Sequence, residues 1–178
     1  MKKKSLHELG RLSVEAFKAQ DPTPIVLVLD NIRSGLNVGS AFRTADAFAL
    51  QKIYLCGITA KPPHREIMKT AIGATQSIEW AYFEKTTDAL RELRQQGFRI
   101  LAVEQTHQSI PLHEADPLSG EKIALIFGNE VRGVSDEALE MAEASLEIPQ
   151  FGTKHSLNIS VCLGIVVWEF FKNRKWPK

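Results

Sequence analysis

The sequence has little that would hold a metal, form disulfides or cross a membrane. Its 178 residues include 2 cysteines, Cys56 and Cys162, which lack metal-ligand spacing and lie in apolar runs, so we expect both to be reduced core residues. The long apolar run near the C-terminus is too short to span a bilayer, and no signal-peptide core follows the basic residues 1–10. We therefore expect a cytoplasmic protein without a membrane segment.

Two phosphate-binding fingerprints are also missing. Residues 30–45 contain Gly35 and Gly39, but the chain has neither GxGxxG nor GxxxxGK[ST]. Their absence argues against a P-loop and against a nucleotide-binding domain of Rossmann or flavodoxin type, which is kept as a rival hypothesis.

Charge is nearly balanced over the whole chain, with 22 Lys and Arg residues against 21 Asp and Glu residues. Basic residues nevertheless gather at both ends: Lys2, Lys3, Lys4 and Arg11, then Lys172, Arg174, Lys175 and Lys178. Such ends can contact nucleic-acid phosphates, or they can be solvated and frayed termini. The sequence leaves both interpretations open.

The hydrophobic pattern predicts one globular domain over residues 24–178, preceded by an amphipathic extension over 1–23 with a helix at 5–19. Strands are expected at 25–29, 52–56, 78–83, 98–103, 123–127 and 146–148, and helices at 38–48, 65–71, 87–96, after Ser135 and at 157–171. Alternating strands and helices predict an α/β fold, with a mostly parallel sheet covered by helices on both faces.

The last predicted helix, over residues 157–171, is apolar on nearly every side. Its length exceeds that of most strands, and we expect Ser156 or Asn158 to cap it. A helix of this kind is covered by its own sheet or by a partner subunit. The loop before it would present backbone N–H groups and the positive helix end to an anionic or polar ligand.

Three loops that follow predicted strands gather polar residues, at 30–43, 128–133 and 149–158. Ligands of open α/β sheets bind outside the carboxyl ends of the strands, so these loops are expected to converge. In the first loop, Asn37 is expected at a helix cap and Arg43 two turns on, a pair that suits a phosphate or a ribose hydroxyl. A capping Asn and a surface Arg are the plainer alternative.

The other two loops have equally plain alternatives when each is taken alone. Asn129, Glu130 and Arg132 lie between two glycines, which let the backbone approach a ligand closely, but a surface Glu–Arg turn would look the same. His155 and Ser156 are adjacent, which is a poor argument for a nucleophilic dyad, because a triad is a spatial arrangement.

Taken together and in order, the loops resemble the three motifs of the SpoU (TrmH) family of SPOUT RNA methyltransferases. The first matches as NVGSAFRTA from Asn37, the second as FGNEVRGV from Phe127, and the third as IPQFGTKHSLNIS from Ile148. The resemblance covers residues 24–171. Gln150 departs from the Met that many members have there.

The resemblance implies an α/β knot fold, with a deep trefoil knot at the C-terminus, and a homodimer whose interface includes the last helix. It implies methyl transfer from S-adenosylmethionine to a ribose 2′-hydroxyl of RNA, without a metal because the sulfonium is itself electrophilic. Short basic flanks without an added RNA-binding domain favour tRNA. Ribosomal RNA, or a non-catalytic knotted RNA-binding dimer, is the alternative.

Residue by residue, the resemblance implies that Arg43 is catalytic and that Asn37, Glu130, Ser156 and Asn158 shape the site. A guanidinium is effectively always protonated, so orienting a phosphate is an easier role for Arg43 than acting as a base. The expected cofactor pocket consists of Glu104, Phe127, Gly128, Asn129, Ile148, Gln150, Ser156 and Leu157. Glu104 is placed there by topology rather than by a motif.

Overall fold

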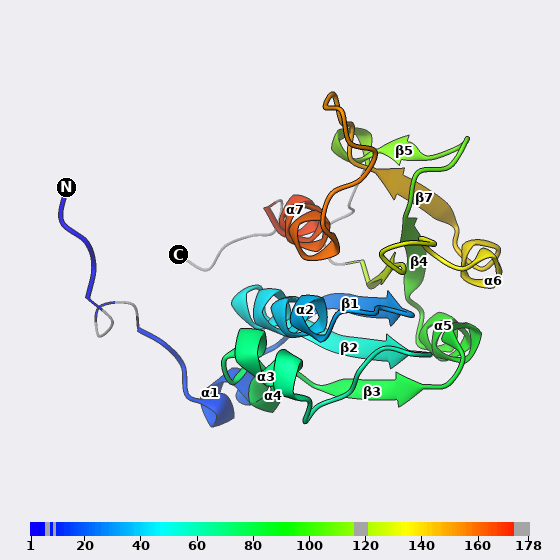
Figure 1. Cartoon of the computed structure of the whole chain (residues 1–178). Coiled ribbons are helices and arrows are strands. Elements are labelled where there is room, and N and C mark those ends of the chain that lie inside the picture. The colour runs from blue at the N-terminus through cyan, green and yellow to red at the C-terminus, as the bar shows by residue number, and fades with distance from the viewer. Residues whose placement is uncertain (6–7, 9, 116–120, 173–178) are drawn as a thin grey trace.

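A computed structural model describes residues 1–5, 8, 10–115 and 121–172. Its strands form one sheet of seven in the order β3-β2-β1-β6-β4-β7-β5 (Figure 1). They are β1 (Thr23–Asp30), β2 (Leu50–Cys56), β3 (Trp80–Phe83), β4 (Arg99–Val103), β5 (Ile110–Pro111), β6 (Ile123–Phe127) and β7 (Ala144–Glu147). All strand pairs found among the described residues are parallel, which confirms the predicted parallel sheet.

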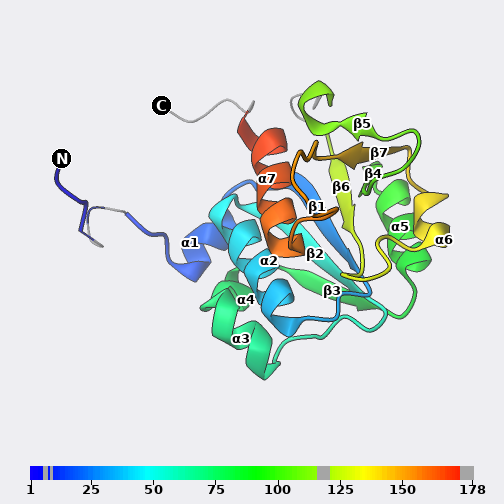
Figure 2. The same ribbon diagram turned by 45° about the horizontal axis from the view of Figure 1, so that its top comes forward.

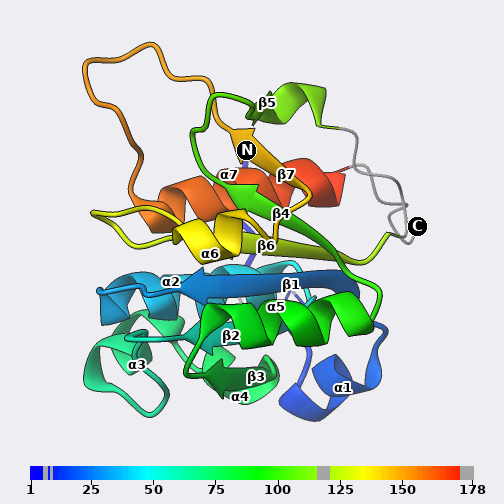
Figure 3. The same cartoon turned by 90° about the vertical axis from the view of Figure 1, so that its right-hand side faces the viewer.

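Helices cover both faces of this sheet, as the sequence predicted. They are α1 (Val14–Ala19), α2 (Gly35–Ala47), α3 (Arg65–Ala71), α4 (Ala74–Ser77), α5 (Thr86–Gln95), α6 (Asp136–Leu139) and α7 (Ile159–Lys172), with a short 3-10 helix η2 (Leu112–Glu114). Figure 2 shows α2 and α7 side by side on one face, with α3 and α4 beyond α2. Figure 3 shows α5 and α6 on the other face.

Two apolar clusters, one on each side, make up the core. In β1, Ile25, Leu27 and Leu29 pack toward α2 and α7, whereas Val26 and Val28 pack toward α5. Successive side chains of a strand point to opposite faces, so a strand covered on both sides is apolar throughout. This is why the continuous apolar runs of β1 and β6 were predictable as central strands.

The predicted N-terminal helix is wrong over residues 10–13. Gly10 has a φ of +57°, and α1 begins only after Ser13, whose Oγ accepts a hydrogen bond from the Ala16 N–H at 3.2 Å. None of the residues of α1 is buried, and Leu12 is 57% exposed, so little apolar burial offsets the entropy of ordering a longer helix. Residues 6–7 and 9 of this prediction lie outside the described residues, and the division at residue 23 stays a prediction.

Two of the predicted helix starts also need correction. Helix α2 begins at Gly35 rather than at 38, because Ser34 is its N-cap and accepts from the Asn37 N–H at 3.3 Å. Asn37 therefore lies in the first turn and not at the cap. For α7, Asn158 is the capping residue of the two that were predicted, since its Oδ1 accepts from the Ser160 N–H at 2.9 Å.

The short elements differ most from the prediction. Neither α4 nor β5 was predicted, and β7 begins and ends earlier than expected, at Ala144–Glu147. Ser135 is the N-cap residue of α6, but its side chain makes no capping hydrogen bond. Instead its backbone N–H donates to Oδ2 of the buried Asp30 at 2.8 Å.

The predictions for the chain ends are tested only in part. Lys172 forms an ion pair with Glu169 at 2.6 Å, while residues 173–178 lie outside the described part of the chain.

Within the described part of the chain, no helix is long and apolar enough to cross a membrane. The cytoplasmic location and the C-terminal knot stay predictions.

Candidate functional site

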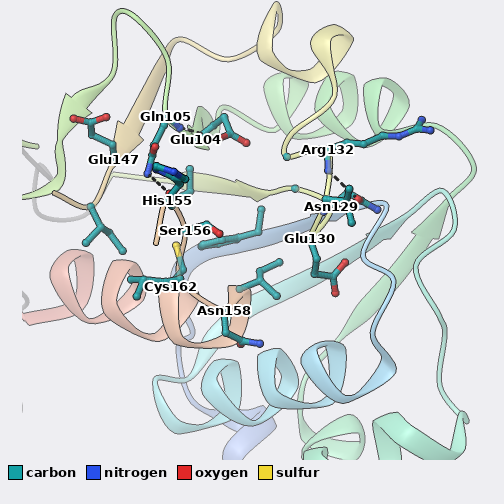
Figure 4. A pocket seen from close by; sticks show the side chains of 18 of the residues that line it. Glu104, Gln105, Asn129, Glu130, Arg132, Glu147, His155, Ser156, Asn158 and Cys162 are labelled. Carbon is teal, nitrogen blue, oxygen red and sulfur yellow. Dashed lines mark hydrogen bonds between the residues drawn. The ribbon is translucent and has the colours of Figure 1, made fainter. Parts of the chain in front are cut away.

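The carboxyl ends of β4, β6 and β7 surround a cavity of about 510 Å³ (Figure 4). Its walls come from Glu104 and Gln105 after β4, from residues 128–133 after β6, from Ile148, Gln150 and residues 155–158 after β7, and from the first turn of α7. The second and third loops of the sequence prediction therefore share one cavity, as expected.

Glu130 connects the first loop to this cavity. Its carboxylate accepts hydrogen bonds from the Arg33 N–H at 2.9 Å, the Ser34 N–H at 3.0 Å and the Asn37 side-chain amide at 3.0 Å. The Asn37 Oδ1 in turn accepts from the Asn158 amide at 3.4 Å. One polar residue from each loop thus joins a continuous chain of hydrogen bonds, which confirms that the three loops converge.

These donors also set the charge state of Glu130. Partial burial alone would raise the pKa of this carboxyl, but the hydrogen bonds from the Arg33 N–H, the Asn37 amide and further backbone N–H groups together outweigh burial and favour the charged form. The pKa of Glu130 consequently lies below its usual value. At neutral pH, Glu130 is an anion that holds the start of α2 in place.

The loop after β6 closes tightly on itself. Asn129 and Gly133 exchange backbone hydrogen bonds of 2.9 and 2.8 Å, and Asn129 Oδ1 accepts from the Val131 and Arg132 N–H groups. The Asn129 amide donates to the Asn31 carbonyl at 2.7 Å, just past the end of β1. A Cβ at Gly128 would overlap the backbone of Gly133, so this turn requires a glycine there.

Glu104 and Gln105, after β4, join this strand end to the second and third loops. The Glu104 Oε2 accepts from the Val134 N–H at 2.9 Å, and a Cβ at Gly133, whose φ is +72°, would overlap the same oxygen. Next to it, the Gln105 amide donates to the His155 carbonyl at 3.0 Å (Figure 4). The cavity walls are therefore fixed by direct bonds between loops that are distant in sequence.

Cys162 was expected in the core but is half-buried and lines the cavity. Burial raises the pKa of its thiol to about 11, and the charge of Glu104 acts in the same direction. It therefore presents a neutral thiol. Cys56 is buried, as predicted, and burial raises the pKa of its thiol to about 12.

Most of the sequence-predicted site residues come together, but not all. The cavity is lined by all the expected cofactor residues (Glu104, Phe127, Gly128, Asn129, Ile148, Gln150, Ser156 and Leu157) and by Glu130 and Asn158. Asn37 and Arg43 are not part of the lining. Asn37 adjoins it through Glu130, whereas Arg43 lies six residues further along α2, about 9 Å of helix rise, and is exposed.

Several lining residues were missed by sequence reasoning, among them Val103, Gln105, Leu146, Glu147, His155 and Cys162. Most of these lie at the ends of β4 and β7, which become neighbours of the β6 loop only through the order of strands in the sheet. The only signal for these residues in the sequence was the change from apolar to polar residues at the end of each strand.

The lining combines apolar and acidic groups. Val103, Leu146, Ile148 and Leu157 supply apolar surface, while Glu104 and Glu147 supply carboxylates. A cavity of this kind suits a ligand with a planar ring, hydroxyls and positive charge. Among the described residues there is no group of three or more His, Cys, Asp or Glu side chains positioned to hold a metal ion.

Known proteins resemble the chain over most of its length. The tRNA (guanosine(18)-2'-O)-methyltransferase of Aquifex aeolicus is 31% identical over 157 residues, which are 85% of this chain and 70% of that protein. The 23S rRNA (guanosine-2'-O-)-methyltransferase RlmB of Neisseria meningitidis is 29% identical over 151 residues, 85% of this chain but 59% of that one.

Solved structures agree with these sequence matches. The AdoMet-bound rRNA methyltransferase from Sinorhizobium meliloti has a TM-score of 0.78 at 29% identity, covering 88% of this chain and 59% of its own. The Aquifex aeolicus TrmH/SpoU tRNA modifying enzyme also has a TM-score of 0.78, at 26% identity, covering 89% and 79%. The family model of the SpoU rRNA methylase family matches residues 24–168. The chain belongs to that family, as its three motifs predicted.

Proposed function

We propose that this protein transfers a methyl group from S-adenosylmethionine to a ribose 2′-hydroxyl of RNA, with tRNA as the favoured substrate. The observation that carries the proposal is the cavity at the carboxyl ends of β4, β6 and β7, where the second and third family motifs form the walls and the first is bonded to them. Relatives that act on tRNA and on rRNA both match the chain, and their names specify 2′-O-methylation of guanosine.

The lining fits the proposed cofactor. A volume of about 510 Å³ lies within the usual range of small-molecule sites, about 300–1,000 Å³. Ile148 and Leu157 offer apolar surface to an adenine ring, and the carboxylate of Glu147 can accept from ribose hydroxyls or an ammonium group. When bound, S-adenosylmethionine supplies a methyl group on an electrophilic sulfonium, so no metal is required.

The remaining motif residues hold the reacting groups in place. Glu130, Asn37 and Asn158 fix the start of α2 against the start of α7, and Ser156 lines the cavity beside them. Arg43 is assigned to the RNA phosphate, where its planar guanidinium orients the ribose. Positioning of this kind accounts for a large part of catalysis in reactions between two bound substrates.

A homodimer is part of the same proposal. Leu157, Val161, Ile165 and Trp168 form an apolar stripe along α7, with exposures between 38% and 52%. Exposed apolar stripes of this kind mark protein interfaces. Because Leu157 also lines the cavity, a second copy seated on the stripe would border the site.

The C-terminal trefoil knot also belongs to the proposal. Its support is the path of residues 148–158, which return from β7 beside the loop after β4 and are bonded to it through Gln105 and His155. The chain then continues into α7 on the opposite side of the sheet from α5 (Figure 3).

The test is transfer of labelled methyl from S-adenosylmethionine to separate pools of unmodified tRNA and ribosomal RNA, followed by nuclease digestion and nucleoside mass spectrometry. We expect a 2′-O-methylnucleoside in the tRNA pool. The same product in the ribosomal pool alone would show that the substrate is ribosomal RNA and not tRNA. A methylated base would show that the methyl group is transferred to a base and not to a ribose. Cofactor binding without transfer to either pool would identify a non-catalytic binding protein.

A further inference from the structure

Three arginines on the α5 side of the sheet have protein partners. Arg91 on α5 pairs with Asp88 at 2.5 Å, and Arg94 donates to the Met141 carbonyl at 2.7 Å. Arg99, at the start of β4, lies 3.5 Å from Glu121 and 3.6 Å from Glu143. These three side chains are therefore already engaged within the protein.

The positively charged side chains on the α3 side of the sheet differ from those on the α5 side in their partners. Arg65 and Lys69 on α3, and Arg33 in the loop before α2, are exposed, and no ion pair found among the described residues involves them. Lys61, in the loop before α3, lies over the exposed Tyr82 ring at 3.9 Å. The acidic residue of this helix, Glu66, is exposed as well, and its side chain lies against Gly35 of α2.

Four exposed residues, three in α3 and one at its C-cap, lie on one side of this helix. Arg65, Met68, Lys69 and Ile72 follow one another at i, i+3, i+4 and i+7, and all four are exposed. We call this set the α3 face. Its two cations suit phosphates, and its two apolar side chains suit the less polar surfaces of ribose and base.

This face lies next to the candidate site through direct packing. Thr70 on α3 donates to the Leu36 carbonyl at 2.9 Å, and a Cβ at Gly35 would meet Glu66 and His64 at 2.9 to 3.0 Å. Figure 2 shows α3 beside α2. Glu130 of the cavity wall accepts from the Arg33 N–H, and Arg33 precedes by two residues the Gly35 that packs against α3.

We propose that the α3 face, with Arg33 and Lys61 at its borders, binds the RNA backbone and holds the substrate beside the cavity. This inference rests on the proposed function and adds the surface by which RNA is recognised. Neutralisation of phosphates by Arg and Lys contributes affinity without reading sequence, so the α3 face acts on substrate binding rather than on the methyl-transfer step.

Two matched double variants test the proposal. Arg65→Ala with Lys69→Ala removes two cations from the α3 face, and Arg91→Ala with Arg94→Ala removes two from α5. Binding of a fluorescein-labelled unmodified tRNA transcript is measured by anisotropy over about 50 to 200 mM salt. For two lost phosphate contacts we expect a salt slope lower by about 1.4 to 1.8, and an affinity lower by up to roughly 25- to 60-fold at ~0.1 M salt. The α5 variant should stay within about twofold of the wild type.

Further measurements separate this proposal from the proposed function. The α3 variant should bind S-adenosylmethionine normally and show a raised KM for RNA with kcat retained. The charge-preserving variant Arg65→Lys with Lys69→Arg should bind RNA like the wild type. If the wild type methylates RNA and the α3 variant binds RNA as well as the α5 variant, the inference is wrong and the function stands. If the wild type neither binds nor methylates either RNA pool, both are overturned.

Discussion

Glu130 acts in this structure as a hydrogen-bond acceptor and not as a proton carrier. Its lowered pKa means that its stabilising contribution is present above the unfolded-state pKa of about 4.3 and is lost as pH falls through the lower folded-state value. We expect Glu130→Gln to lower the free energy of unfolding by roughly 1 kcal/mol at neutral pH, because the group is largely exposed. Denaturant unfolding should show this difference shrinking below about pH 4.

The matched control for this pH dependence is Glu84→Gln. Glu84 is exposed and accepts no hydrogen bond from the described residues, so its replacement should leave stability almost unchanged at either pH. A difference between wild type and Glu130→Gln that persists in acid would show that the charge of Glu130 is not what holds the first loop.

The role of Arg43 is harder to infer, because this residue lies outside the cavity of the single chain. We expect Arg43→Ala to lower methyl transfer by about 10²-fold or more, since small losses of substrate alignment have effects of that size. Binding of S-adenosylmethionine, measured by calorimetry, should be unchanged. Arg43→Lys keeps the charge without the planar fork and should recover part of the activity. Turnover near that of the wild type in Arg43→Ala would contradict the assignment.

For single residues, the sequence indicated which side chains belong to the site better than it indicated which of them touch one another. The motif pattern placed Asn37, Glu130 and Asn158 in one site, and in the structure these three side chains are joined by hydrogen bonds. The pattern did not place Cys162 in the cavity wall. Its position depends on which side of α7 faces the cavity, and an apolar helix gives no periodic signal to decide that.

Close contact between α2 and α3 sets the position of the first motif. A Cβ at Gly39 would overlap Thr70 Oγ1 and the Ile67 carbonyl of α3. We expect Gly39→Ala to lower the free energy of unfolding by about 1–3 kcal/mol, the usual effect of overpacking, in a denaturant titration. Gly164, inside α7, has no atom within 4 Å of an added Cβ. Gly164→Ala should therefore be neutral or stabilise by about 0.5–1 kcal/mol. Equal effects of the two changes would contradict this packing argument.

Helices and strands were predictable in proportion to the apolar surface they bury. The sequence predicted β6 at its observed bounds, residues 123–127, because all five of its residues are buried. It also predicted α3, whose bounds follow from Ile67 and Ala71 packing inward. The two-residue strand β5 could not be predicted, because its pairing with β7 depends on tertiary structure and not on its own sequence.

At the scale of the whole molecule, the order of the strands in the sheet determines which loops are neighbours, and the sequence did not predict that order. Strand β6 lies between β1 and β4, so the second motif is next to Glu104 on one side and next to the first motif on the other. Patterns within the chain predict that strands exist but not which strand lies beside which. Glu104 was placed in the pocket by expecting an α/β topology, and its bond to the Val134 N–H agrees with that placement.

The dimer is the prediction that belongs to the molecule as a whole. The wild type should have twice the mass of one chain by light scattering, and Val161→Glu with Ile165→Glu should be monomeric, because two buried charges without partners strongly oppose association. A matched control, Leu12→Glu with Ile58→Glu, adds the same charge at exposed positions outside α7 and the α3 face and should leave the dimer intact. Since Leu157 belongs both to the apolar stripe and to the cavity wall, separating the copies should also lower methyl transfer. A monomeric wild type that methylates RNA at full rate would show that one chain contains the complete site.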